Sequence, residues 1–73
     1  DGMSIDEAGN LYFSGRGGVW VASPQGESLG LIAVPEFCSN VTFGGARGKT
    51  LYLTCQGKVY RLPMNMRGGR FAP

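Results

Sequence analysis

An internal repeat restricts the fold of this 73-residue chain more than any other feature. The segment 11–14 (LYFS) returns as 51–54 (LYLT), displaced by 40 positions. Three further pairs share this displacement: Gly17 and Gly57, Val19 and Val59, and Trp20 and Tyr60. Upstream, Ser4 and Ile5 match Thr42 and Phe43 at a displacement of 38, and the difference of two residues falls in turns, where insertions are tolerated. One structural unit therefore occurs twice.

Each copy has the pattern of consecutive β-strands. Met3, Ile5, Leu11 and Phe13 alternate with polar residues around a turn at 6–10, which predicts a hairpin. Glycine and proline punctuate the rest of the chain as turn residues rather than clustering. The further predicted strands span residues 19–21, 28–34, 40–44, 50–55 and 58–62. The chain is therefore expected to be all-β, built as antiparallel meanders.

A four-stranded meander that recurs about every 40 residues is typical of a β-propeller blade. Residues 1–35 form one predicted blade, residues 39–62 a partial blade, and residues 63–73 an irregular tail. The chain thus holds about one and three-quarter blades, whereas a propeller closes with about four to eight. We expect the partners to be the remaining blades of a longer chain, with other copies of this chain as the alternative.

Composition and charge exclude several classes of function. The net charge of +2 comes without a dense basic stripe beside aromatics, so no nucleic-acid partner is expected. There is no apolar run of about 18 residues, so we expect no membrane partner, and we predict a cytoplasmic location. Histidine is absent, which leaves carboxylates, amides and thiols to carry any chemistry.

The two cysteines, Cys38 and Cys55, are 17 positions apart and form no CxxC motif. Two thiols alone do not make a zinc site. We expect small buried thiols, and a single disulfide is the alternative.

Asp1 is the strongest chemical candidate. It precedes a predicted strand and is followed by Gly2, a combination that suits a metal ligand or a catalytic carboxylate; a solvated chain end is the alternative. Asp6 and Glu7 lie in the hairpin turn and are expected to be solvated. Asn40 heads the second copy, one position after Ser39, which corresponds to Asp1; we expect a strand-start amide there, with a channel-facing role as the alternative.

Large side chains outside these positions are expected to serve packing. Trp20 and Tyr60 occupy equivalent positions and are interpreted as contacts between blades rather than substrate platforms. Met64 and Met66 are expected to pack in the tail or at an edge.

Five short motifs in a fixed order resemble the C-terminal end of the SMP-30/gluconolactonase/LRE-like family. They are Asp1-Gly2-Met3, Asp6 with Gly9-Asn10-Leu11-Tyr12, Gly17-Gly18-Val19-Trp20-Val21, Phe43-Gly44-Gly45, and Leu51-Tyr52-Leu53-Thr54. The likeness covers nearly the whole chain.

The resemblance implies a six-bladed propeller lactonase. It implies that Asp1 is a ligand of a divalent cation and the acid/base residue of lactone hydrolysis. Calcium is the first expectation for this cation, with magnesium, manganese or zinc as alternatives. The family's other ligands are a glutamate near the N-terminus and asparagines on middle blades, in segments outside this sequence. The family layout also implies that the fourth strand of the last blade comes from the N-terminus of the longer protein.

The sequence is therefore compatible with two functions. The first is a C-terminal portion of a metal-dependent lactone hydrolase with a small lactone as substrate, and the isolated chain is not expected to be an efficient enzyme. The alternative is a non-catalytic propeller segment that acts as a binding or self-assembling module, with Asp1 bound to no metal.

Overall fold

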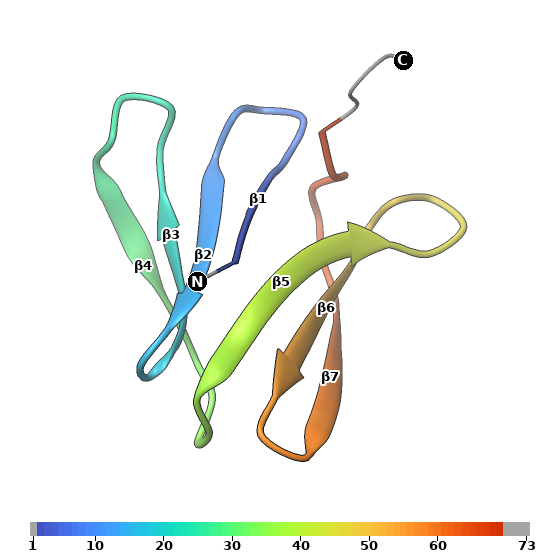
Figure 1. The fold of residues 1–73 in the computed structure, drawn as a ribbon. Helices are drawn as coiled ribbons and strands as arrows, with labels where there is room; N and C mark the ends of the chain where they lie inside the picture. Colours follow the sequence, from blue (N-terminus) through green and yellow to red (C-terminus); the bar gives the residue numbers. More distant parts are fainter. Residues whose placement is uncertain (1, 70–73) are drawn as a thin grey trace.

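The computed structural model describes residues 2–69, which form seven strands in two sheets (Figure 1). The strands are β1 (Met3–Ile5), β2 (Leu11–Gly15), β3 (Gly18–Ala22), β4 (Ser28–Ala33), β5 (Cys38–Gly44), β6 (Thr50–Cys55) and β7 (Lys58–Pro63). No helix among these residues is long and apolar enough to cross a membrane.

Both sheets are antiparallel meanders in which each strand pairs with its neighbour in sequence. The first sheet has the order β1-β2-β3-β4, and the second has the order β5-β6-β7. The predicted all-β class is confirmed, and every predicted strand is present with ends shifted by a few residues at most.

The repeat is also visible in the turns. β2 and β6 are the second strands of their sheets, and each leads into its third strand through two residues. The second turn residue is Gly17 in one sheet, with φ of 89°, and Gly57 in the other, with φ of 72°. Such positive φ angles favour glycine, so the repeated glycine fixes the same hairpin in both sheets.

The core lies between the two sheets, where β5 packs across β1, β2 and β3. Alternate residues of each strand point into it, as the period of two requires. Tyr12 meets the ring of Phe43 edge to face, with 5.1 Å between ring centroids. The apolar residues with no exposed surface are Val19, Cys38, Leu51 and Leu53. Burial of each large aliphatic side chain stabilises the fold by about 1.5–3 kcal/mol.

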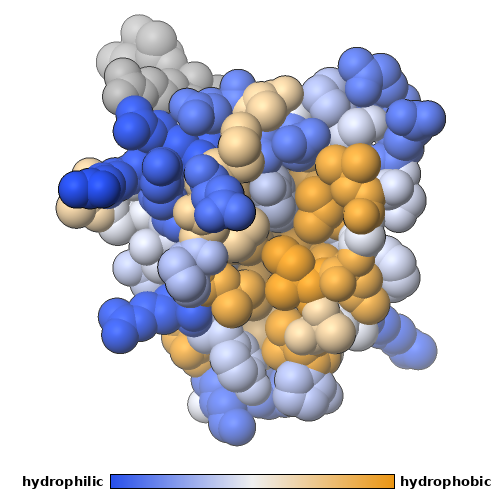
Figure 2. All heavy atoms as spheres, turned by 180° about the vertical axis from the view of Figure 1, so that it is seen from behind, coloured by the Kyte–Doolittle hydropathy of each residue, from blue (hydrophilic) through white to orange (hydrophobic). Residues whose placement is uncertain are grey.

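The opposite face of the first sheet is apolar and open. The strand register aligns Met3, Phe13, Trp20 and Leu31 in one row across all four strands. Met3 is 64% exposed, Trp20 43% and Leu31 40%. We call this row the outer face. Figure 2 shows an apolar area on the rear of the molecule, toward the side of β1–β4.

Residues 64–69 cross from the second sheet back to the first; we call them the strap. The amide of Met64 donates to the carbonyl of Lys49 at 2.8 Å, and that of Gly68 to Gly48 at 2.8 Å. At the other end the amide of Gly69 donates to Ile5, also at 2.8 Å. The irregular tail that was predicted therefore has no strand over 64–69, but it links both sheets. Residues 70–73 lie outside the described residues.

Candidate functional site

The candidate site is the head of β1, where the sequence places Asp1. Asp1 itself lies outside the described residues, so the local geometry begins at Gly2. The Gly2 amide donates to Ser14 Oγ at 3.0 Å, and the Gly2 carbonyl accepts from the Ser14 amide at 3.0 Å. The Ser14 hydroxyl donates to the same carbonyl at 3.3 Å. Ser14 is 5% exposed, so these bonds are made at a buried position.

Asn40 on β5 forms a wall against the other side of Gly2. A Cβ atom added to Gly2 would lie 2.6 Å from Asn40 Cγ and 2.8 Å from its Cα, so only glycine fits. Asn40 Oδ1 accepts from the Val41 amide at 2.8 Å, and the residue remains exposed. Asn40 was expected at the start of its strand, but β5 begins two residues earlier, at Cys38. The fold brings Asn40 beside Gly2, the residue that follows Asp1 in the sequence.

The second sheet repeats this arrangement with different chemistry. Thr54 corresponds to Ser14 in the repeat, and Ser39 corresponds to Asp1. The Ser39 and Thr54 hydroxyls lie 3.2 Å apart, and the Ser39 hydroxyl also reaches the Thr54 carbonyl at 3.3 Å. Both residues are exposed. A hydroxyl on the second strand thus contacts the head of the first strand in both sheets.

The expectation of a solvated Asp6 is wrong: this residue is 2% exposed. Its carboxylate organises the turn between β1 and β2. Asp6 Oδ1 accepts from the amides of Ala8 and Asn10, both at 2.9 Å. Asp6 Oδ2 accepts from Asn10 Nδ2 at 3.0 Å and from the Tyr12 hydroxyl at 2.8 Å. The polar residues predicted a turn here, but the sequence does not show that the turn residues surround the Asp6 carboxylate and donate hydrogen bonds to it. Glu7 is exposed, as expected.

The Asp6–Tyr12 pair has opposite pKa shifts. Burial alone would raise the pKa of Asp6, but the hydrogen bonds from Asn10, Tyr12 and Ala8 outweigh it and lower this pKa below its usual range. Burial, followed by the bond to the Asp6 carboxylate, raises the pKa of Tyr12 to about 12. At neutral pH Asp6 is therefore a carboxylate and Tyr12 is a neutral phenol that donates to it. This pair suits a hydrogen bond that stabilises the turn rather than proton transfer.

Cys38 and Cys55 form a disulfide rather than the buried thiols that were expected. They face each other in the register of β5 and β6, with their Cα atoms 4.0 Å apart. Sequence spacing did not reveal this pairing because the register depends on where each strand begins. The bond joins the start of β5 to the end of β6.

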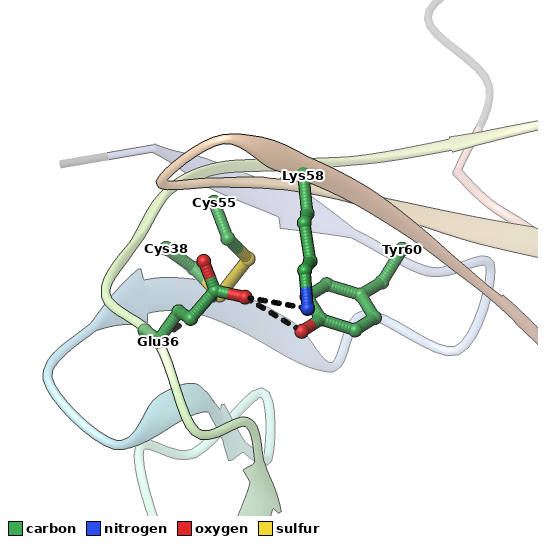
Figure 3. Close-up of polar contacts among 5 residues, drawn as sticks. All are labelled: Glu36, Cys38, Cys55, Lys58 and Tyr60. Carbon is green, nitrogen blue, oxygen red and sulfur yellow. Dashed lines mark hydrogen bonds and ion pairs between the residues drawn. A yellow bond between two sulfur atoms is a disulfide. The ribbon is translucent and has the colours of Figure 1, made fainter.

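A polar cluster stands next to the disulfide, as Figure 3 shows. Glu36 Oε1 accepts from the Tyr60 hydroxyl at 2.8 Å and lies 3.7 Å from Lys58 Nζ. The Glu36 hydrogen bond, with some burial, raises the pKa of Tyr60. The cluster fixes the connector that leads from β4 into β5.

The two equivalent aromatics lie in different surroundings. Tyr60 is partly buried and packs against the core between the sheets, as expected for a contact between blades. Trp20 lies on the outer face, and its indole Nε1 donates to the Arg16 carbonyl at 3.2 Å. Its contact with another blade stays a prediction. Met64 packs against the core, and Met66 is partly buried.

The described residues do not fit a complete metal site. Residues 2–69 contain no group of three or more His, Cys, Asp or Glu side chains placed to share an ion. A hollow of about 420 Å³ beside β1 is lined by Met3, Ser4, Ile5, Leu11 and Thr42, none of which carries a charge. Calcium takes about six to eight oxygen ligands, so residues 2–69 do not make such a site by themselves.

Comparison with known proteins identifies the family of this chain. The profile of the SMP-30/gluconolactonase/LRE-like region matches residues 1–57. This chain belongs to that family. A gluconolactonase of Zymomonas mobilis is 42% identical over 64 residues. The X-ray structure of a protein named as a candidate gluconolactonase superposes with a TM-score of 0.92 at 37% identity. The predicted family and propeller-type fold are thus confirmed.

The chain spans only a small part of these relatives. The match to the Zymomonas protein covers 85% of this chain and 18% of that protein. The structural match covers 97% of this chain and 24% of the other. The lengths fit a short stretch of a larger propeller whose remaining blades would complete the ring.

Proposed function

We propose that this chain is the C-terminal portion of a divalent-metal-dependent lactone hydrolase of the gluconolactonase type. The family match over residues 1–57, which begins with the Asp1-Gly2-Met3 motif, carries this proposal. The identity of 42% with a gluconolactonase supports the lactone as the substrate class. The other blades of the longer protein are the partners of the chain.

The reaction adds water to a cyclic ester. The oxygen of water bonds to the carbonyl carbon, the bond from that carbon to the ring oxygen breaks, and a hydroxy acid results. Asp1 accepts the proton of the attacking water and returns it to the departing ring oxygen, as a general base and then a general acid. A bound divalent cation would polarise the carbonyl and lower the pKa of water.

The cation belongs to the complete propeller. In our proposal Asp1 supplies one of its oxygen ligands, and other blades supply the rest. Calcium is the first candidate because oxygen ligands suit it; magnesium, manganese and zinc are alternatives. Isolated residues 1–73 are accordingly expected to have little or no lactonase activity.

The test is lactone hydrolysis by the complete protein, followed as proton release from a sugar lactone. We expect activity that a chelator abolishes and that one of the four cations restores. Asp1→Asn should lower kcat by about a hundredfold or more, since general acid-base catalysis contributes about that much. Glu7→Gln, at an exposed carboxylate of the same hairpin, is the control and should keep full activity. Inactivity with every cation, or full activity of Asp1→Asn, would contradict the proposal.

A further inference from the structure

The second sheet has a face that no other part of residues 2–69 covers. It lies on the side of β6 and β7 away from the core, and we call it the far face; it is formed by Thr50, Tyr52, Val59 and Arg61. We propose that another blade of the longer protein covers the far face and places a carboxylate, from an Asp or Glu side chain, against Arg61. This inference needs the remaining blades but no lactonase activity, so it is tested separately from the reaction.

The repeat shows that this side of a blade is normally covered. In the first sheet, Tyr12 is 4% exposed and Val19 is 0% exposed, because the second sheet lies over them. Their repeat equivalents in the far face are Tyr52, which is partly exposed, and Val59, which is 69% exposed. The same positions are therefore enclosed in one copy and open among residues 2–69 in the other, which favours a further blade over the far face.

One position on this side of the blade differs in charge between the copies. Tyr12 faces Val21 across β2 and β3. At the same place in the second sheet, Tyr52 faces Arg61 across β6 and β7. Val21 packs against the core and lines a hollow together with Met64 of the strap. The contact between the two sheets is thus apolar at this point, whereas a blade that covers the far face meets a guanidinium.

The surroundings of Arg61 favour an anion as its partner. A hollow of about 300 Å³ on the far face has a cation and no carboxylate in its lining, which consists of Thr50, Tyr52, Arg61 and Pro63. The ion pair within residues 2–69 joins Lys58 and Glu36, so Arg61 has no acidic partner there. Burial of a guanidinium without a partner is costly, and a carboxylate offsets this cost by accepting two parallel hydrogen bonds. A covering blade therefore needs an acidic side chain at this point.

A second copy of this chain would cover the far face poorly. In a head-to-tail ring of copies, the far face would meet the outer face, whose row is Met3, Phe13, Trp20 and Leu31. That row has no carboxylate, so Arg61 would be enclosed without an acidic partner. The matched stretch is 18% of the Zymomonas gluconolactonase, so a protein of that length has further segments to supply the cover. Another blade is therefore the occupant that fits this face.

Arg61→Val in the complete protein introduces the residue that the first sheet has at this position and decides between an apolar and an acidic cover. An acidic cover would be left as a buried unpaired charge, so we expect the melting temperature to fall by about 5 °C or more. With an apolar cover, loss of the guanidinium would leave the melting temperature unchanged or raise it, and either result would overturn the inference. Arg47→Val removes the same charge from an exposed turn and should stay within about 2 °C of wild type.

Carbodiimide cross-linking of Arg61→Lys identifies the acidic group. The reagent joins the introduced amine to a carboxylate that it touches, with loss of water, whereas the guanidinium of the wild type does not react. In the monomeric complete protein, we expect peptide mass spectrometry to find position 61 linked to an Asp or Glu outside residues 1–73. Arg47→Lys, in the exposed turn, is the control and should give no link to that residue.

Two further results would overturn the inference. A link from position 61 to an Asp or Glu of residues 1–73, in the same chain or in a second copy, would place the acidic partner within this sequence. A lower melting temperature of Arg61→Val without any link in Arg61→Lys would show that the partner of Arg61 is not a carboxylate. If the expected link forms but the complete protein hydrolyses no lactone with any cation, the proposed function fails and this inference stands.

Discussion

At the scale of single residues, two carboxylates near the start of the chain differ in role: Asp6 is structural, whereas Asp1 is the proposed catalytic residue. Asp6 and Asp1 both flank β1, and both occur in family motifs. Asp6 is enclosed and accepts four hydrogen bonds, so its oxygens are occupied by the turn. Asp1 owes its candidacy to the family resemblance and to the Asp1-Gly2-Met3 motif that it begins.

Asp6→Ala is expected to destabilise the fold strongly. The change leaves the Tyr12 hydroxyl and the turn amides without an acceptor, which should cost roughly 3 kcal/mol of unfolding free energy. The lowered pKa of Asp6 gives a stabilisation that is present above the unfolded-state pKa of about 3.9 and is lost as pH falls through the folded-state pKa. Urea unfolding between pH 7 and pH 2 should therefore show an acid loss of stability that is smaller in Asp6→Asn.

Glu7→Gln removes the same charge from the exposed neighbouring residue and is the control for that comparison. If Asp6→Asn and wild type lose stability in parallel down to pH 2, the Asp6 carboxylate is not the group responsible.

At the scale of elements, the strap depends on two glycines that approach the sheets closely. A Cβ atom at Gly68 would lie 2.5 Å from Phe43 Cβ and 2.9 Å from its Cγ. Gly68→Ala should therefore push the strap off β5 and lower the unfolding free energy by about 1–3 kcal/mol, the usual cost of overpacking. Amide hydrogen exchange should show faster exchange at Gly68 and Gly69, whose bonds tie the strap to both sheets.

Gly15→Ala is the matched control for the strap. An added Cβ at Gly15 meets no atom within 4 Å, and its φ angle lies outside the positive range. It should leave the exchange of the strap unchanged. A Gly68→Ala protein as stable as Gly15→Ala would show that the strap is not held against Phe43.

Strands and turns could be predicted because their signals are local. The alternation of apolar and polar residues and the repeated glycine turns predicted the ends of the strands to within a few residues. The strap, the burial of Asp6 and the disulfide could not be predicted in this way, because they depend on contacts between segments that are apart in the sequence. Cys38 and Cys55 meet only through the β5–β6 register. Asp1 stays a prediction from the sequence, and the contacts of Gly2 with Ser14 and Asn40 could not be predicted because they join segments far apart in the chain.

At the scale of the whole molecule, the repeat indicates what covers the outer face. Leu51 and Leu53 of the second sheet are fully buried because the first sheet lies over them. Their counterparts Leu11 and Phe13 point to the outer face, where residues 2–69 supply no such cover and both stay partly exposed. Since each large apolar side chain gains about 1.5–3 kcal/mol on burial, this face favours a preceding blade.

Trp20, the single tryptophan, reports on that contact because it lies in the outer-face row and is 43% exposed. In isolated residues 1–73 its fluorescence should be that of a solvated indole, and adding the remaining blades as a separate polypeptide should shift the emission to shorter wavelength. Leu31→Lys, next to Trp20 in the register, should weaken this shift, whereas Gln25→Lys in an exposed turn adds the same charge and should not. If residues 1–73 alone sediment as a ring of several copies with Trp20 already buried, the cover is a second copy, and the self-assembling module replaces the lactonase fragment.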